Sequence, residues 1–368
     1  MMSPLGKRLA GFLFGHSRRE DECVLWGTMT TSPATTQEPN PASIFEAANA
    51  YQRSAALKAA IQLDVFTEID RGTRKPDAIA KAVGASARGV RILCDFLVVS
   101  GSLSKEGGEY SLSADSARFL SRNSPAYLGT ALNFLLDPRL TAPFLNLEQV
   151  VRAGRTTLPD EGTVSHDNPI WVTFAQQMAP MVYPAALEVA ALVAGQGDLT
   201  VLDIAAGHGL FGITIAQRNT KARITGSDWP NVLGVATENA LKFGVADRYS
   251  IRPGDAFEVE FGGPYDLTLV TNFFHHFDPP TCEKLMRKIL AALAPGGRCV
   301  TLDFIPNDDR VSPPIPAAFA MMMLGTTPAG DVYTFAEYDR MFRNAGFTSS
   351  ELHILTKSPE AVIVSHKA

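Results

Sequence analysis

The chain has 368 residues, which is long enough for two domains with substantial cores. Hydrophobic residues make up 46% and the formal net charge is −5, whereas a dedicated nucleic-acid binder would usually be basic. No uncharged apolar run reaches the roughly 18 residues that a membrane span needs. The four cysteines form no C-x-x-C pair, so we expect neither a zinc site nor a disulfide framework, and a cytoplasmic protein.

The N-terminal segment is rich in Thr, Pro and Ser over residues 30–41, a composition that predicts disorder. Met29 stands directly before this stretch, so either Met29 is the natural start or the whole segment is an unstructured tail. We treat residues 1–41 as a disordered tail.

Residues 42–125 are predicted to form a small domain of helices followed by a hairpin. Ser43 can cap an Ala-rich helix whose apolar residues recur at helical spacing as far as Ile61. Pro76 suits the first turn of a second helix, a third helix follows Ser86, and residues 103–112 have the pattern of a hairpin. Helix, turn, helix and hairpin in this order indicate a winged helix.

A winged helix can read DNA, or it can serve as a dimerisation and substrate-lid module. The helix that follows Ser86 offers only Arg88 and Arg91 as basic residues, and the hairpin carries Glu106 and Glu109. Phosphate contacts need a row of Lys and Arg, so the composition favours the dimerisation module.

Residues 126–196 are predicted to be linker helices. Apolar residues recur at helical spacing in three stretches, 127–136, 140–151 and 174–193. Pro180 and Pro184 are expected to break or bend the last of them, and the polar stretch 154–168 is expected to be a loop.

From residue 197 onward, short apolar stretches alternate with helical ones, which predicts an α/β domain with a mostly parallel sheet covered on both faces. The expected parallel strands are 200–203, 223–228, 249–252, 265–274 and 298–304. Residues 350–355 and 361–366 are predicted to close the sheet as an antiparallel pair.

The stretch from Thr200 to Gly209 has the pattern of a strand, a Gly-rich turn and a helix start, which lets backbone come close to a ligand. Such units hold ligands at the carboxyl ends of parallel strands. The spacing of Gly207, Gly209 and Gly212 matches the dinucleotide fingerprint, but the spacing alone is a weak signal. We therefore predict a nucleoside-type cofactor at this turn.

Three acidic residues end successive predicted strands: Asp203, Asp228 and Asp255. Asp228 stands about twenty residues beyond the turn, where a ribose diol would lie. Three carboxylates repel a pyrophosphate but suit a ligand with hydroxyls, an amine and a positive centre, such as S-adenosylmethionine. Each acid alone is better explained as a cap or turn residue. The series favours S-adenosylmethionine and leaves a dehydrogenase as the alternative.

Five motifs carry a resemblance to a known family: Val201-Leu202-Asp203 with Gly207 and Gly209, Gly226-Ser227-Asp228-Trp229-Pro230, Gly254-Asp255-Ala256-Phe257, His275-His276-Phe277-Asp278, and Pro295-Gly296-Gly297. With them, the chain resembles the S-adenosylmethionine-dependent small-molecule O-methyltransferases. These include caffeate-type plant enzymes, acetylserotonin methyltransferase and bacterial natural-product enzymes. The resemblance implies a Rossmann-like class I methyltransferase domain with a seven-stranded sheet over 197–368. It also implies a winged-helix dimerisation domain over 42–125 and a homodimer.

The resemblance also implies cofactor contacts. From the methionine end to the adenine, the matching residues are Asp203, Gly207, Gly209, Asp228, Asp255 and Phe257. The loop residues would contact the methionine end, Asp228 the ribose hydroxyls, and the last two the adenine. Asn272 or Thr271 would lie beside the cofactor. The role of His208 stays open between capping the next helix and contacting the cofactor's carboxylate.

Methyl transfer from a sulfonium needs alignment of the acceptor with the methyl group and removal of a proton, and it needs no metal ion. Histidine suits the proton removal near neutral pH, and the family places its base at the position of His275. Neighbours on an extended strand point to opposite faces, so only one of His275 and His276 is expected to enter the site. Asp303 matches the acid that orients the base.

The chain departs from the family at its further acid, because Val332 stands at that place beside Asp331, the candidate replacement. The very apolar stretch 316–324 is either a buried helix or, as in the family, a wall of the acceptor pocket. The pocket residues would be Phe319, Met322 and Met323, which indicates an aromatic or polyketide-like small-molecule acceptor. Methylation at carbon or nitrogen, an altered reaction on the same cofactor, and a winged-helix regulator remain alternatives.

Overall fold

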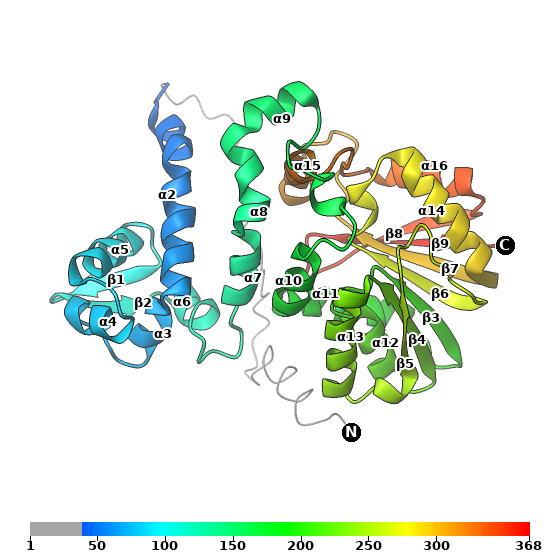
Figure 1. Cartoon of the computed structure of the whole chain (residues 1–368), viewed down its shortest axis with the longest axis horizontal. Coiled ribbons are helices and arrows are strands. Elements are labelled where there is room, and N and C mark those ends of the chain that lie inside the picture. Colours follow the sequence, from blue (N-terminus) through cyan, green and yellow to red (C-terminus); the bar gives the residue numbers. More distant parts are fainter. Residues whose placement is uncertain (1–38) are drawn as a thin grey trace. The chain divides into compact units, whose positions relative to one another are not determined.

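The computed structural model describes residues 39–368, which divide into two compact units, 39–137 and 138–368 (Figure 1). The predicted disordered tail and the proposed start at Met29 lie outside the described residues, except for the last three positions of the tail. Within the described range, no helix combines the length and the apolar character needed to cross a bilayer.

The first unit contains the helices and the hairpin in the predicted order. Its elements are α2 (Ala42–Gln62), α3 (Val65–Asp70), α4 (Pro76–Ala82), α5 (Ala87–Val99), β1 (Leu103–Glu106), β2 (Glu109–Leu112), α6 (Ala114–Phe119) and α7 (Gly129–Leu135). Ser86 caps α5 by accepting a hydrogen bond from the amide of Gly89 at 3.0 Å. The predicted cap at Ser43 is wrong, because α2 begins at Ala42, whose amide donates to Asn40 Oδ1 at 2.9 Å.

The N-terminal half of α2 leaves apolar side chains exposed. Every residue from 42 to 55 is exposed. Among them, Ile44, Phe45 and Tyr51 have exposed fractions of 70%, 63% and 68%. The C-terminal half packs into the core of the unit through Ala60 and Ile61.

The second unit begins with short helices. They are α8 (Pro138–Thr141), η1 (Ala142–Asn146), α9 (Leu147–Ala153), η2 (Gly162–Val164), α10 (Ile170–Gln177) and α11 (Ala179–Val193). The single helix predicted over 140–151 is wrong, because Pro143 lies at the start of a 3-10 turn that divides it. The stretch 174–193 is divided at Met178, as Pro180 in the first turn of α11 requires.

A seven-stranded sheet forms the centre of the second unit, with the order β5-β4-β3-β6-β7-β9-β8. Its strands are β3 (Leu199–Ile204), β4 (Ala222–Asp228), β5 (Tyr249–Pro253), β6 (Tyr265–Thr271), β7 (Leu293–Asp303), β8 (Ser349–Ile354) and β9 (Ala361–His366). All neighbours pair in parallel except β9, which runs antiparallel to β7 and β8. The predicted class I sheet is therefore confirmed.

Two groups of helices cover the sheet (Figure 1). The remaining helical elements are α12 (Leu210–Arg218), α13 (Pro230–Lys242), η3 (Ala246–Arg248), η4 (Phe274–His276), α14 (Pro279–Ala292), α15 (Pro314–Thr326) and α16 (Phe335–Ala345). Helices α12 and α13 contact β3, β4 and β5, whereas α14 and α16 pack on each other beside β7 and β8. The chain order reverses between β3 and β6, so their carboxyl ends mark the position where α/β sheets bind ligands.

The fourth parallel strand ends earlier than predicted. β6 stops at Thr271, and Asn272 adopts a left-handed conformation with φ 52° before the 3-10 turn η4. His275 and His276 therefore lie on a turn, and their ring centroids are 4.3 Å apart. The expectation that they point to opposite faces is wrong, because it assumed an extended strand.

Candidate active site

The Gly-rich turn between β3 and α12 contains three left-handed residues within five positions. Ala205, Gly207 and Gly209 have φ values of 52°, 56° and 72°. A left-handed alanine costs on the order of 1 kcal/mol, and strain of this kind is typical of functional sites. A Cβ at Gly209 would lie 2.8 Å from the Tyr249 hydroxyl, so only glycine fits there.

Two carboxylates hold this turn, the buried Asp203 and the half-buried Asp228. Asp228 Oδ2 accepts a hydrogen bond from the amide of Gly207 at 2.8 Å, and Asp203 Oδ2 accepts one from Gly212 at 3.2 Å. Burial raises the pKa of Asp228 to about 6 and the pKa of Asp203 to about 8. Asp203 Oδ1 has no hydrogen-bond partner within residues 39–368. Asp228 Oδ1 also accepts from the amide of Trp229 at 2.7 Å, so both acids shape the turn and Asp203 Oδ1 is the oxygen without a partner there.

His208 has a structural partner in the same turn. Its Nδ1 accepts a hydrogen bond from the amide of Leu210 at 3.2 Å, so the side chain caps α12. Burial lowers the pKa of His208 to about 4, which keeps the ring neutral. Of the two roles left open by the sequence, the capping role is the one that this geometry provides.

The loop after β5 comes close to the η4 turn through its aromatic residue. Asp255 Oδ1 accepts a hydrogen bond from the amide of Phe257 at 2.7 Å, which closes a tight turn. The Phe257 ring packs edge-on against Phe277, with centroids 5.0 Å apart. The structure therefore places the two residues predicted for the adenine at the same edge of the sheet as the histidines.

Asn272 carries an unused acceptor at the end of the central strand β6. Its backbone N–H donates to the Leu302 carbonyl at 2.8 Å, while its buried side-chain Oδ1 has no partner among the described residues. Thr271, the alternative predicted at this place, is buried in β6. Buried polar atoms are nearly always hydrogen-bonded, so Asn272 Oδ1 fits a ligand that donates a hydrogen bond.

His275 and Asp303 form a buried pair. Nδ1 of the histidine lies 2.6 Å from Oδ1 of the aspartate, and their side chains are 3% and 1% exposed. Because the carboxylate is an acceptor, we assign the proton to Nδ1, which leaves Nε2 as a free acceptor. This arrangement orients the imidazole to take a proton at Nε2.

His276 lies beside this pair in a different environment. Its ring packs edge-on against Trp171 at 5.1 Å, and its Nδ1 has no partner within the described range. Burial, and secondarily the neighbouring His275, lowers the pKa of His276 well below its ordinary value. Of the two histidines, His275 is the one whose ring is held by a carboxylate.

Aromatic residues border the histidine on the side of α15. The Phe319 ring stacks on Phe304 with centroids 4.0 Å apart, and its edge meets His275 at 5.0 Å. Met322 and Met323 lie one turn further along the helix, Met323 buried and Met322 partly exposed. The structure thus brings Phe319 directly to the histidine.

Both parts of the chain are similar to known proteins. A family model of a methyltransferase domain matches residues 201–297, and one of an O-methyltransferase dimerisation domain matches residues 45–122. A solved Nostoc punctiforme structure, assigned as an O-methyltransferase, is 51% identical. It has a TM-score of 0.87 and covers 90% of this chain and 100% of its own. The chain belongs to the S-adenosylmethionine-dependent O-methyltransferase family.

Two named relatives belong to the same class of enzyme. The tetracenomycin polyketide synthesis 8-O-methyltransferase of Streptomyces glaucescens is 26% identical over 337 residues, which are 89% of this chain and 97% of that protein. The 3-hydroxy-5-methyl-1-naphthoate 3-O-methyltransferase of Streptomyces sahachiroi is 26% identical over 312 residues, 83% of this chain and 89% of that one.

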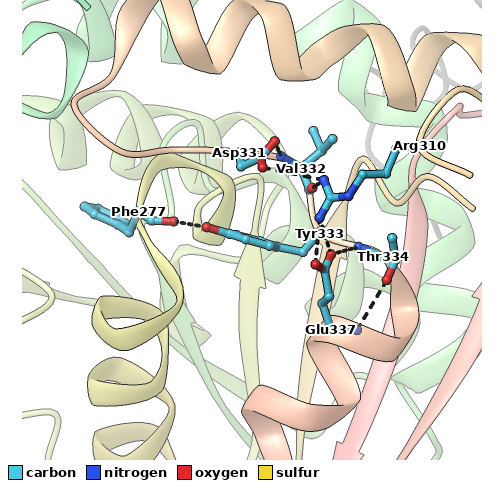
Figure 2. Close-up of polar contacts among 7 residues, drawn as sticks. All are labelled: Phe277, Arg310, Asp331, Val332, Tyr333, Thr334 and Glu337. Atoms are coloured by element: carbon cyan, nitrogen blue, oxygen red, sulfur yellow. Dashed lines mark hydrogen bonds and ion pairs between the residues drawn. The ribbon is translucent and has the colours of Figure 1, made fainter. Parts of the chain in front are cut away.

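In this O-methyltransferase, Asp331 belongs to a surface cluster instead of the histidine pair. Its Oδ1 accepts a hydrogen bond from the amide of Val332 at 2.8 Å, and its Oδ2 lies 3.5 Å from Arg310 (Figure 2). Arg310 also binds both oxygens of Glu337, at 2.6 and 2.7 Å. This geometry argues against Asp331 as the group that replaces the family's further acid.

The sequence did not identify the group that binds the far oxygen of Asp303. The Tyr338 hydroxyl donates to Asp303 Oδ2 at 2.7 Å, and the amide of Phe304 donates to Oδ1 at 2.8 Å. The helical spacing of α16 indicates that Tyr338 is buried, but no sequence pattern names the partner of its hydroxyl 35 positions away. The methyltransferase thus surrounds Asp303 with three donors.

Proposed function

We propose that this enzyme methylates a hydroxyl of a small aromatic or polyketide-like molecule, with His275 as the general base. The observation that carries the proposal is the buried pair of His275 and Asp303, 2.6 Å apart, at the same sheet edge as the Gly-rich turn. A histidine held by a carboxylate is the arrangement that hydroxyl activation requires.

Residues at this edge fit the methyl donor. Two buried acceptors without partners in the described chain, Asp203 Oδ1 and Asn272 Oδ1, suit a ligand that carries an ammonium group and hydroxyls. Asp228 would accept from the ribose hydroxyls, and Asp255 with Phe257 would border the adenine. When bound, S-adenosylmethionine supplies a methyl group on a positively charged sulfur.

The protein's part in the reaction is proton transfer and positioning. His275 Nε2 accepts the proton of the acceptor hydroxyl, which makes the oxygen a better nucleophile. The ring then carries a positive charge, and Asp303 stabilises it at Nδ1. Because both groups are buried, the attraction between them is stronger than it would be in water.

The aromatic border of His275 supports the choice of acceptor. Phe319 and Phe304 offer a stacked pair of flat apolar rings next to the histidine. Flat ligands pack well against such rings. The two named relatives act, by their names, in tetracenomycin polyketide synthesis and on a naphthoate, which are both compatible with this border.

We further propose that the enzyme is a homodimer built through its first unit. The dimerisation family model covers residues 45–122, which include the exposed Phe45 and Tyr51 of α2 and begin directly after the exposed Ile44. Ile44, Phe45 and Tyr51 would be removed from water by a second copy, which would stabilise the pair. Sedimentation of the full chain tests this, and a monomer at micromolar concentration would contradict it.

The deciding experiment uses the full chain with S-adenosylmethionine labelled in its methyl group and a panel of phenols, hydroxynaphthoates and hydroxylated polyketides. We expect label in an ether product, and a loss of about 10²-fold or more in rate for His275→Ala. Cofactor binding, measured by calorimetry, should persist in that variant. His276→Ala is the matched control, and unchanged turnover in His275→Ala with loss in His276→Ala would overturn the assignment of the base.

A further inference from the structure

The two oxygens of the Asp303 carboxylate bind side chains from two different elements, η4 and α16. Oδ1 faces His275 Nδ1 at 2.6 Å, and Oδ2 accepts the Tyr338 hydroxyl at 2.7 Å. We propose that Tyr338 is a positioning residue that holds Asp303 toward His275 and thereby keeps the base in its working orientation. This inference rests on the proposed role of His275.

Tyr338 contacts both the turn that carries His275 and the strand end that carries Asp303. It is fully buried, and its ring packs edge-on against Phe274 with centroids 6.2 Å apart. Phe274 directly precedes His275 on η4, while the hydroxyl reaches Asp303 at the end of β7. One side chain from α16 therefore bridges the two elements that carry the base and its partner.

The hydroxyl of Tyr338 is a permanent donor. Burial, and secondarily the charge of Asp303, raises the pKa of Tyr338 well above its ordinary value. The hydroxyl is therefore protonated at neutral pH. A carboxylic acid at the same place would become an anion beside Asp303 and would repel it. A tyrosine thus supplies the hydrogen bond without a competing charge.

The first turn of α16 is anchored by a capping box and by an arginine (Figure 2). Thr334 and Glu337 form a capping box, in which each side chain accepts from the other residue's backbone amide, at 3.3 and 2.9 Å. Arg310 binds Glu337 through both carboxylate oxygens, a geometry that restricts its orientation. This anchor fixes the residue directly before Tyr338.

A second tyrosine ties the same segment to the histidine turn. The Tyr333 hydroxyl donates to the Phe277 carbonyl at 2.6 Å, as Figure 2 shows. The two hydroxyls differ in one respect that an experiment can use. Tyr333 binds a backbone carbonyl and Tyr338 binds the carboxylate that faces the base, so Tyr333 serves as a matched control for burial and packing.

Other titratable groups lie near His275 and Asp303, and the test must distinguish their titration from the effect of the Tyr338 hydrogen bond. Burial lowers the pKa of His276, and burial raises the pKa values of Cys282, Tyr333 and Glu360. His276, Cys282 and Tyr333 therefore stay neutral over the pH range of a typical assay. Glu360 is an acid whose pKa, raised mainly by burial, also depends on the charges of Asp303 and His275, so Glu360→Gln belongs in the experiment as a second control.

The test compares Tyr338→Phe with Tyr333→Phe in the full-length enzyme. We expect Tyr338→Phe to lower kcat by about tenfold to a hundredfold, the value of a hydrogen bond to a charged group, with KM for both substrates within about twofold. The Phe304 amide still donates to Asp303 Oδ1, but the carboxylate loses one hydrogen bond that stabilises its negative charge, so it attracts a protonated imidazole more strongly. The acid limb of kcat/KM should therefore move to higher pH. Tyr333→Phe should lower the thermal midpoint without moving that limb.

A double-mutant comparison separates positioning from packing. In Asp303→Asn, the charge that Tyr338 binds is gone, so adding Tyr338→Phe should lower kcat by less than about threefold. An equal loss in both backgrounds would overturn the proposal, as would an unchanged kcat and acid limb in Tyr338→Phe. Full activity in His275→Ala would instead refute the proposed function itself.

A second probe covers the case in which the phenylalanine variant does not fold. Replacing Tyr338 by 3-fluorotyrosine makes the hydroxyl a stronger donor at nearly unchanged volume. The acid limb should then move in the opposite direction, to lower pH, and the downfield proton resonance of the His275–Asp303 hydrogen bond should shift. If neither changes, Tyr338 does not act on the pair.

Discussion

Asp303 meets His275 because two neighbouring parallel strands end side by side. β6 and β7 pair in register from Leu267 with Arg298 to Thr271 with Leu302, so the residue after the paired stretch of β7 faces the turn that follows β6. The left-handed Asn272 directs the chain into η4, which brings His275 back over the end of β7. The base and its partner, 28 positions apart, are thus joined by sheet topology.

Replacing Asp303 by Asn should nearly abolish turnover and leave the fold intact. The amide has a similar shape but no charge to stabilise the protonated ring, and it can turn an N–H toward His275 and favour the wrong tautomer. We expect a fall of about 10²-fold or more in kcat, with cofactor affinity within threefold by calorimetry. Turnover within twofold of the original enzyme would show that the pair is only structural.

Cofactor binding should weaken at acidic pH through Asp228. Burial raises the pKa of this carboxyl to about 6 in the protein without ligand. The ionised form accepts hydrogen bonds from ribose hydroxyls and the protonated form loses acceptor capacity, so binding favours ionisation. The affinity for S-adenosylmethionine should rise by up to about tenfold per pH unit between pH 5 and 6 and level off above.

Calorimetry at pH 5, 6 and 7 measures this dependence. Asp228→Asn cannot titrate, so it should bind more weakly at pH 7 and show a flatter profile. An affinity that stays constant between pH 5 and 7 in the original enzyme would contradict the role given to Asp228.

Asp203 should make the unliganded fold less stable as the pH rises. Burial raises its pKa to about 8, against about 3.9 in an unfolded chain, so the folded state favours the protonated form. The stabilisation is complete below pH 4 and is lost as the pH rises toward 8. Asp203→Asn keeps an acceptor for the Gly212 amide and removes the titration.

Urea unfolding of the two proteins should therefore diverge with pH. We expect similar free energies of unfolding at pH 5 and a value at least about 1 kcal/mol higher for the variant at pH 9. If the variant is less stable at both pH values, the carboxylate must be ionised and hydrogen-bonded in the folded protein.

The sequence predicted the sheet because its signals are local. Apolar runs such as the one ending at Asp203 mark buried strands, and acids at successive strand ends indicate a shared ligand edge. The end of β6 was placed too late because the left-handed conformation of Asn272 depends on its hydrogen bond to Leu302 in the neighbouring strand. The expectation that His275 and His276 point to opposite faces followed from that error, because both lie on the η4 turn.

Contacts between distant segments could not be predicted from the sequence for a related reason. A buried tyrosine at position 338 follows from the apolar face of α16, but the partner of its hydroxyl depends on how the helix packs against β7. The same holds for Asp331. It stands next to Val332, which occupies the position of the family's further acid, but the Asp331 carboxylate pairs with Arg310. A matching position therefore predicts a residue's place better than its partner.

Gly330 should be required for the placement of the base. A Cβ at this position would lie 2.4 Å from the His275 carbonyl oxygen and 2.6 Å from Thr327 Oγ1, so Gly330→Ala must displace the η4 turn. Overpacking of this kind costs about 1–3 kcal/mol in stability. The displacement moves His275 itself, so kcat should fall by about tenfold or more, because small misplacements of catalytic groups are costly.

Gly234 provides the matched control for that substitution. It lies in α13, where a Cβ would meet no atom within 4 Å, so Gly234→Ala should keep full activity and gain up to about 1 kcal/mol in stability from helix propensity. Thermal unfolding and kcat measured for both variants decide the matter. Normal kcat in Gly330→Ala, with a loss of stability alone, would mean that the η4 turn tolerates movement without disturbing the base.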